Sequence, residues 1–366
     1  SMKSRYIDIN KILRILYVNN GFFFYNPNNK TCVIGSAIKL SNEVEGLVED
    51  TENVSFYAFP FFDDLREKEL NLWKEVKMGE VKFPYNYTFS FLYENDMNYK
   101  THTYHINSDD YKNWESLFNN VMKGIKEGKV EKVVASREII VSFDIKVDFA
   151  NIMCKLLNNN PRNFVFAYVY GDKAFIGATP EILVEKKEDH ILSYALAGTR
   201  AKVDDKRDGE ILLKDIKNNY EHKIVVDAIV DTMRNASGSV TVGNTELMEL
   251  KNLFHLKTPI VAIDNKFSIV EWAKMLHPTP AMGGKPQKIA MEIIRKYEKH
   301  DRGLFAAPIG IVRENGDGIF VVGIRSALIN KNEIYAYAGC GIVKQSNCRE
   351  EYDETNIKLR TILEAL

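Results

Sequence analysis

One segment of the sequence carries a carboxylate in surroundings that suit catalysis or metal binding. Apolar residues surround most of the circumference of a helix predicted over residues 209–234, a pattern typical of a buried helix. Glu221 lies among them, and an ionised carboxylate in an apolar environment needs a cation or a metal ion as partner. Lys217 and His222 on the same segment support an alternative equally well, in which Glu221 is a hydrated surface residue. The segment alone leaves both interpretations open.

A second set of carboxylates lies near the C-terminus. Glu351, Glu354 and Lys358 have the i, i+3 and i+7 spacing that places side chains on one face of a helix, which is predicted to open at Glu350. Acidic residues in a first turn and an i,i+4 ion pair are also ordinary helix-stabilising features, and this segment alone favours that simpler interpretation. If Glu354 and Glu221 meet in the folded chain, two carboxylates with water suit octahedral Mg²⁺.

Two further residues could transfer protons. Lys132 lies in a strand predicted over residues 129–141, which has apolar residues on both faces. Burial favours the neutral form of a lysine, which can act as a general base, although a lysine that protects an edge strand from aggregation gives the same pattern. Glu181 follows the turn at residues 177–180, so its side chain is either directed into a site or is an ordinary exposed turn residue.

An arginine and two glycine turns could bind an anion. Arg325 lies in the otherwise apolar segment 322–327, and arginine is rarely buried without a partner. Its guanidinium group could form a two-point contact with a ligand carboxylate. The turns at residues 197–199 and 338–341 either present backbone N–H groups to the same anion or are simple strand ends.

Antiparallel strands are the elements expected to position these side chains. Runs of β-branched and aromatic residues predict strands at residues 21–25, 54–60, 85–92, 129–141, 164–170, 174–177, 181–187, 190–197, 309–312, 319–324 and 334–338, with short turns between successive ones. Helices are expected at residues 63–77, 109–127 with Ser108 as cap, 148–158, 209–234 and from 350 onward. Strands and helices come in blocks, which predicts an α+β fold with large antiparallel sheets.

Composition and charge restrict the classes of function. The 366 residues predict about two domains at roughly 150 residues each. There are 49 basic and 50 acidic residues, so a formal charge of -1 gives no overall field that would attract nucleic acid or anionic lipid. Four cysteines are too few for a disulfide framework, and no apolar run approaches the roughly 18 residues of a membrane helix. We expect a cytoplasmic protein without nucleic-acid or membrane partners.

The candidate residues above lie in motifs that follow one another in a recognisable order. The motifs are Lys132-Val-Val-Ala-Ser-Arg137, Gly177-Ala-Thr-Pro-Glu-Ile-Leu183, Ala195-Leu-Ala-Gly-Thr-Arg200, Asp215-Ile-Lys217 with Glu221-His222, Leu276-His-Pro-Thr-Pro-Ala281, Asp301-Arg-Gly303, Gly323-Ile-Arg-Ser-Ala327, Tyr337-Ala-Gly-Cys-Gly-Ile-Val343 and Glu351-Tyr-Asp-Glu-Thr355 with Lys358. From about residue 131 to the end, the chain resembles the chorismate-utilising enzymes, most closely the isochorismate synthases. The resemblance implies one interwoven α+β unit with two antiparallel sheets packed between helices. Residues 1–107 would form its aromatic-rich N-terminal part and residues 108–366 its chorismate-binding catalytic region.

The resemblance also implies a reaction, in which water attacks C2 of chorismate while the hydroxyl at C4 leaves. Lys132 matches the general base for the water and Glu181 matches the acid that protonates the leaving hydroxyl. Glu221 and Glu354 match Mg²⁺ ligands, with Glu351 close by. The residues implied to bind the substrate are Gly198, Thr199, His255, Arg325, Tyr337, Gly341 and Lys358, of which Arg325 and Tyr337 would hold the enolpyruvyl carboxylate. No obligatory protein partner is implied, and we expect a monomer.

Differences among the relatives favour water as the nucleophile. Ala197 stands where aminodeoxychorismate synthases, which the chain also resembles, have a nucleophilic lysine, and anthranilate synthases do not share the lysine matched by Lys132. Salicylate synthases share Lys132 and Glu181 and go on to eliminate pyruvate, but they diverge around residues 277–280, where this chain resembles an isochorismate synthase. Salicylate synthase and a catalytically silent chorismate-binding protein are the alternatives. Cys340 is a departure from the family, which usually has alanine there.

Overall fold

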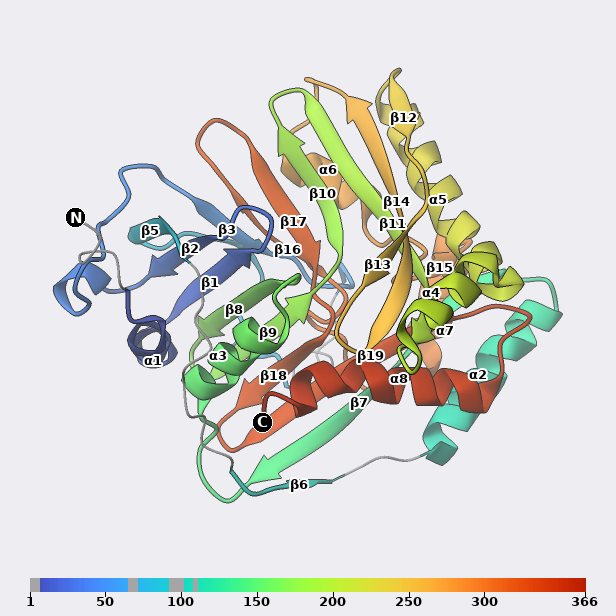
Figure 1. The fold of residues 1–366 in the computed structure, drawn as a ribbon, viewed down its shortest axis with the longest axis horizontal. Helices are drawn as coiled ribbons and strands as arrows, with labels where there is room; N and C mark the ends of the chain where they lie inside the picture. Colours follow the sequence, from blue (N-terminus) through green and yellow to red (C-terminus); the bar gives the residue numbers. More distant parts are fainter. Residues whose placement is uncertain (1–6, 65–71, 92–101, 108–110) are drawn as a thin grey trace.

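Two large antiparallel sheets form the body of the protein in the computed structural model, which describes residues 7–64, 72–91, 102–107 and 111–366 (Figure 1). Within these residues the first sheet has ten strands in the order β15-β7-β19-β18-β9-β8-β1-β2-β5, with β6 beside β7. They are β1 (Gly21–Asn26), β2 (Thr31–Ser36), β5 (Tyr85–Ser90), β6 (Tyr104–Ile106), β7 (Lys132–Phe143), β8 (Phe164–Tyr170), β9 (Lys173–Thr179), β15 (Gly284–Lys285), β18 (Ser326–Asn330) and β19 (Glu333–Ile342).

The second sheet has nine strands among the described residues, in the order β12-β14-β11-β10-β17-β16-β3-β4, with β13 beside β14. They are β3 (Ser55–Ala58), β4 (Gly79–Val81), β10 (Ile182–Lys187), β11 (His190–Ala201), β12 (Val240–Val242), β13 (Glu246–Glu249), β14 (Leu253–Ile263), β16 (Pro308–Val312) and β17 (Gly318–Val322). Strands from residues 1–107 enter both sheets, because β1 pairs with β8 and β3 pairs with β16.

Helices pack on the outer faces of both sheets (Figure 1). The α-helices are α1 (Ile9–Asn19), α2 (Tyr111–Lys126), α3 (Phe149–Asn159), α4 (Asp205–Lys214), α5 (Ile216–Ala236), α6 (Ile269–Leu276), α7 (Gln287–Tyr297) and α8 (Cys348–Leu363), and Leu40–Asn42 form a short 3₁₀ turn, η2. On the first sheet, α1 and α3 bury residues such as Leu13 and Met153, and on the second sheet α5 and α6 bury residues such as Val225 and Trp272. The helices use one apolar face each for this burial, as their sequence periodicity requires.

A third apolar cluster fills the space between the sheets. Phe22 and Phe166 of the first sheet contribute to it together with Phe56 and Ile309 of the second sheet. Successive residues of one strand point to opposite faces of the sheet. Val165 therefore belongs to the core under the helices, and Phe166 belongs to the core between the sheets. This arrangement confirms the prediction of an α+β fold in which two antiparallel sheets pack between helices.

The prediction of a single helix over residues 209–234 is wrong, because the chain forms two helices, α4 and α5, with a break at Asp215. The backbone of Asp215 is extended, and its carboxylate accepts the backbone N–H of Asn218 at 2.9 Å. Aspartate is a favoured N-cap for this reason, and here the cap overrides continuous apolar periodicity. The break sets the direction in which α5 enters the structure.

Several other expected boundaries differ from the observed ones. The elements that were not expected are α1, α6, α7, η2, β2, β4, β12, β13, β14, β15 and β18. The C-terminal helix begins two residues early, at Cys348. The predicted helix at 63–77 falls partly on residues 65–71, outside the described residues, and its described neighbours form bends and turns. The cap expected at Ser108 also lies outside the described residues. Among the helices that are described, none has the length and apolar character needed to cross a membrane.

Candidate active site

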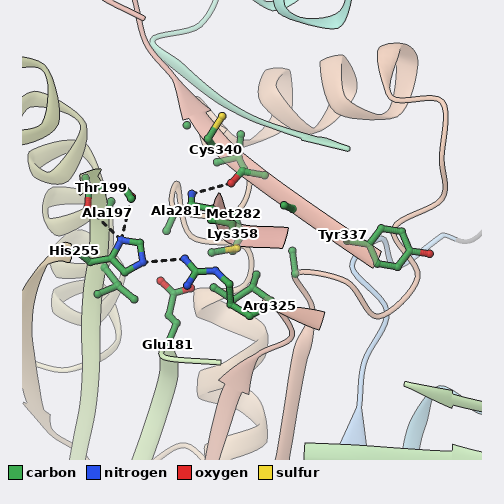
Figure 2. Close-up of a pocket in the computed structure, with 18 of the residues that line it drawn as sticks. Glu181, Ala197, Thr199, His255, Ala281, Met282, Arg325, Tyr337, Cys340 and Lys358 are labelled. Atoms are coloured by element: carbon green, nitrogen blue, oxygen red, sulfur yellow. Dashed lines mark hydrogen bonds between the residues drawn. The ribbon is translucent and has the colours of Figure 1, made fainter. Parts of the chain in front are cut away.

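A cavity lies where strands of both sheets meet α5 and α8. Nine of the twelve residues predicted for the site line it, namely Glu181, Gly198, Thr199, Glu221, His255, Arg325, Tyr337, Gly341 and Lys358. Figure 2 labels six of them, Glu181, Thr199, His255, Arg325, Tyr337 and Lys358. Glu351 and Glu354 line an adjoining groove that shares Thr199 with the cavity, and Lys132 lies behind the wall against Glu221. The fold thus brings residues that are more than 200 positions apart in the sequence into one region.

Lys132 and Glu221 form a buried ion pair. Nζ of Lys132 lies 3.1 Å from Oε1 of Glu221, and the two side chains are 1% and 9% exposed. Gly341 on the neighbouring strand leaves the room for this pair, since an added Cβ there would lie 2.1 Å from Oε1 of Glu221 and 2.5 Å from Cε of Lys132. The ion pair requires the ammonium form of Lys132, so the lysine must release a proton before it can accept one from water.

A second lysine, Lys217, joins the carboxylates of α5 and α8. Its Nζ lies 2.6 Å from Oε1 of Glu351 and 3.9 Å from Oε2 of Glu221. Burial acts to raise the pKa of Glu221, but attraction to the ammonium groups of Lys132 and Lys217 outweighs it and lowers that pKa below its ordinary value. Sequence reasoning treated Lys217 only as a neighbour that might keep Glu221 hydrated; in the structure it helps to assemble a buried carboxylate cluster.

The donor set of this carboxylate cluster fits a divalent cation. Glu351 is only 3% exposed, and its Oε2 has no hydrogen-bond partner among the described residues. Burial, and then repulsion from Glu354, raise the pKa of Glu351 to about 7. Glu354 is half-buried and accepts a hydrogen bond from Nζ of Lys358 at 3.1 Å. A buried carboxylate oxygen without a partner, beside further carboxylates, is the oxygen-rich arrangement that Mg²⁺ prefers.

Glu181 is a buried carboxyl group at the start of β10. It is 3% exposed, and its Oε2 has no hydrogen-bond partner among the residues described. Burial raises the pKa of Glu181 to about 8, although the positive charges of Lys132, Arg325 and Lys358 oppose this shift. The group is therefore a carboxylic acid at neutral pH, with a proton that it can donate into the cavity.

His255 connects the arginine predicted to bind an anion with the glycine turn. Nη2 of Arg325 lies 2.8 Å from Nε2 of His255, and Nδ1 of His255 lies 3.0 Å from Oγ1 of Thr199 and 3.3 Å from the carbonyl oxygen of Gly198 (Figure 2). Arginine can only donate, so Nε2 accepts and the ring proton resides on Nδ1. Burial, and then Arg325 and Lys358, lower the pKa of His255 well below its usual range, which keeps the ring neutral.

The backbone at Arg325 is held in an unusual conformation. Its φ of 50° lies in the left-handed region, which an arginine seldom adopts. The carbonyl oxygen of Arg325 accepts the backbone N–H of Ala178 at 3.0 Å, so the turn before β18 is tied to β9. Burial lowers the pKa of Arg325 to about 10, against the attraction of Glu354 and Glu181, and the guanidinium group stays charged at neutral pH. Strain of this kind is concentrated at functional sites.

Tyr337 lines the cavity differently from the other predicted residues. Its ring stacks on Phe305, with centroids 5.2 Å apart and planes at 21°. In Figure 2 the hydroxyl group points away from Arg325 and Lys358. The structure therefore does not bring this hydroxyl to the Arg325 cluster, and a role in holding a carboxylate stays a prediction. Phe305, which sequence reasoning did not single out, forms the adjoining part of the wall.

Arg302 is a second residue to which sequence reasoning gave no role, although its motif was recognised. It is 2% exposed and donates to the carbonyl oxygens of Val134 and Met282, both at 2.9 Å. Val134 and Met282 line the cavity, and Glu298 holds Arg302 through a buried ion pair at 2.7 Å. The only sequence signal was the Asp301-Arg-Gly303 motif.

The chain is similar to known proteins along most of its length. The profile of the family described as "Chorismate binding enzyme" matches residues 85–366. Isochorismate synthase MenF of Bacillus subtilis is 37% identical over 263 residues, which are 70% of this chain and 56% of that protein. Isochorismate synthase EntC of Escherichia coli is 34% identical over 242 residues, which are 64% of this chain and 62% of that protein. The alignments thus span less than two thirds of these relatives.

The likeness to a solved structure extends further along the chain. DhbC from Bacillus anthracis has a TM-score of 0.82 at 26% identity, covering 98% of this chain and 99% of that chain. The match therefore includes the N-terminal strands, for which the sequence motifs gave no assignment. With the family profile covering well over half of the residues, the chain belongs to the chorismate binding enzymes.

Proposed function

We propose that this protein is an isochorismate synthase, which converts chorismate to isochorismate. In this reaction a C2–O bond forms as water attacks, the ring double bonds shift, and the C4–O bond breaks. The attacking water gives a proton to a base, and the leaving hydroxyl receives a proton from an acid, so the net change is an isomerisation. The names of the relatives MenF and EntC support this activity.

The burial of Glu181 at the wall of the cavity is the observation that carries the proposal. A hydroxyl group leaves poorly unless it is protonated as it departs, so the site needs a carboxylic acid that keeps its proton at neutral pH. Burial supplies this by raising the pKa of Glu181 to about 8, and Glu181 lines the cavity. Burying a carboxylate costs free energy, and a chemical role for Glu181 accounts for its being buried in spite of that cost.

Lys132 is proposed to accept the proton from water. It is close enough to Glu181 to lower the pKa of that carboxyl group, and its Nζ lies 3.1 Å from Oε1 of Glu221. Ala197 lines the cavity and has no amine, which supports water and not a protein side chain as the nucleophile.

Positive groups on two sides of the cavity suit a dianionic substrate. Arg325 and Lys358 both line the cavity, and neutral His255 accepts from Arg325, which fixes the direction of the guanidinium group. A fixed guanidinium group is well suited to a carboxylate because it donates two parallel hydrogen bonds. The overall charge of -1 is therefore compatible with an anionic ligand, because the positive charge is local.

We propose Glu221, Glu351 and Glu354 as the residues that would hold Mg²⁺. Two observations support this assignment: the buried Oε2 of Glu351 has no hydrogen-bond partner among the described residues, and carboxylates of α5 and α8 both approach Lys217. When bound, the metal would supply a Lewis-acidic contact for a carboxylate of the substrate. The protein's own contribution is to place the carboxylates on two helices that the core holds rigidly.

Product analysis tests the proposed activity. The full chain is incubated with chorismate and Mg²⁺, and the products are separated by chromatography beside a Glu181→Gln variant. We expect isochorismate from the wild-type protein and none from the variant. Salicylate with pyruvate would establish the salicylate synthase alternative instead, and binding of chorismate without turnover would identify a silent binding protein.

A further inference from the structure

The thiol of Cys340 lies beside the proposed metal ligands. The sulfur of Cys340, a carboxylate oxygen of Glu351 and one of Glu354 all lie within 4.8 Å of one another. Cys340 is on β19 and 2% exposed, whereas the two glutamates are on the first turns of α8. Possible ligand atoms from a strand and a helix thus lie near one another, and the thiol also contacts the backbone carbonyl oxygen of Glu351 at 3.6 Å.

An independent observation also points to a ligand at this position. Glu351 is 97% buried, being 3% exposed, yet its Oε2 has no hydrogen-bond partner among the described residues. Its other oxygen is already engaged by Lys217 at 2.6 Å. A buried acceptor without a donor costs free energy, which a cation at this place would offset.

We propose that Cys340 gives this metal site a sulfur ligand, so that thiophilic divalent ions such as Co²⁺, Zn²⁺ or Cd²⁺ bind there through Cys340, Glu351 and Glu354. The inference rests on the proposed metal site and deepens it. Thiolates select these ions, whereas Mg²⁺ prefers oxygen ligands only. The family that the chain resembles usually has alanine at this position. A site with that alanine would offer only oxygen ligands and would not favour thiophilic ions.

The thiol of Cys340 loses its proton to solvent as the metal–sulfur bond forms, and no electron is transferred. A divalent ion deprotonates a coordinating thiol outright. Mg²⁺ prefers oxygen ligands and would not displace this proton.

Cobalt spectroscopy tests the inference without relying on catalysis. Co²⁺ is titrated into the reduced, metal-free full chain, and the near-ultraviolet sulfur-to-cobalt charge-transfer absorption is recorded. We expect the band in the wild-type protein and in the control Cys348→Ala, because Cys348 lies at the start of α8 and outside the cluster of Cys340, Glu351 and Glu354. Cys340→Ala is expected to lack the band and to bind Cd²⁺ at least about tenfold more weakly, with its Mg²⁺ affinity changed far less.

Two results would overturn the inference. One is an unchanged charge-transfer band in Cys340→Ala, and the other is Co²⁺ binding by the wild-type protein with no such band. Turnover of chorismate by the wild-type protein with Mg²⁺ is measured in parallel. Turnover without a sulfur–cobalt band would reject the role of Cys340 and leave the proposed function intact. The band without turnover would support the role of Cys340 and contradict the proposed function.

Discussion

The ammonium group of Lys132 lies 3.1 Å from the carboxylate of Glu221, and the chain leaves room for this contact only because residue 341 is glycine. A candidate base and a candidate metal ligand are therefore electrostatically linked. Charge drawn away from Glu221 changes the protonation balance of Lys132, and loss of either group leaves the other buried without its partner. The first prediction follows from this link.

Replacing Lys132 with alanine is expected to abolish turnover while chorismate still binds, because the cavity keeps Arg325 and Lys358. The unpaired carboxylate of Glu221 should also lower the free energy of unfolding by about 3–5 kcal/mol, the range for breaking a buried ion pair. Turnover assays, calorimetric binding and denaturant unfolding measure the three effects. Lys257→Ala is the control, since Lys257 is on β14 and its ammonium group lies over the ring of Tyr194, away from Glu221. Activity retained by the Lys132 variant would remove this lysine from the mechanism.

The pH dependence should report the proton on Glu181. The pKa of Glu181 is raised from its ordinary 4.5 to about 8, so the acid form predominates below pH 8 and is lost above it. We expect kcat/KM to fall as pH rises through about 8. A folded-state pKa above the unfolded one means that the folded chain binds more protons between pH 4.5 and 8, so Glu181 makes stability fall with rising pH in that window.

Variants separate this effect from other titrations. Glu181→Gln should lack activity and should show a smaller decline of stability between pH 4.5 and 8. Glu185→Gln, on β10 and outside the cavity lining, should keep the wild-type pH profile of kcat/KM. An alkaline limb that persists unchanged in a Glu181 variant with residual activity would assign the limb to another group.

Local sequence signals were sufficient for much of the fold. The strand predicted at residues 164–170 is observed with the same bounds as β8, because a continuous apolar run is delimited by a turn at each end. Lys132 and Arg325 were identified as candidates because a charged residue in an apolar run must find a partner in the fold. The break at Asp215 was missed because its capping hydrogen bond competes with periodicity that continues across it.

The relations between distant residues could not be obtained in this way. The contact of Lys217 with Glu351 joins residues 134 positions apart, and only the packing of α8 beside α5 creates it. Tyr337 and Gly341 share one face of β19, but they are four positions apart along the strand, which rises by about 3.3 Å per residue. The sequence can predict the shared face, whereas the direction of the Tyr337 hydroxyl depends on its stacking with Phe305.

Gly341→Ala should lower kcat by about 100-fold, the size of effect expected when reacting groups are displaced by about 1 Å. An alanine Cβ would lie 2.1 Å from Oε1 of Glu221, so the carboxylate and Lys132 must move apart. Steady-state kinetics and circular dichroism should show the loss in a folded protein. Gly238→Ala is the control, because nothing lies within 4 Å of its added Cβ. Wild-type kcat in the Gly341 variant would show that the Lys132–Glu221 geometry is unimportant.

Arg325→Lys should weaken substrate binding more than it slows the chemical step. Lysine keeps the charge but loses the planar group that His255 orients through the 2.8 Å contact. Hydrogen bonds to charged groups contribute about 1.5–3 kcal/mol, so KM should rise by about 10- to 100-fold. Arg313→Lys, at a surface ion pair with Glu52, should leave KM unchanged. A fall in kcat with KM unchanged would show that Arg325 acts in the chemical step and not in substrate binding.

The metal assignment predicts distinct effects of two glutamates on the same helix. Glu354→Gln should lower the affinity for Mg²⁺ by about 10- to 100-fold and shift the Mg²⁺ activation curve by the same factor, since it removes a ligand charge next to Glu351. Glu350→Gln, an exposed neighbour in the first turn, should leave both unchanged. Calorimetric titration with Mg²⁺ measures affinity independently of turnover, and a chelator should abolish wild-type activity reversibly. Full activity in the chelator, or equal Mg²⁺ affinity in the two variants, would reject Glu354 as a ligand.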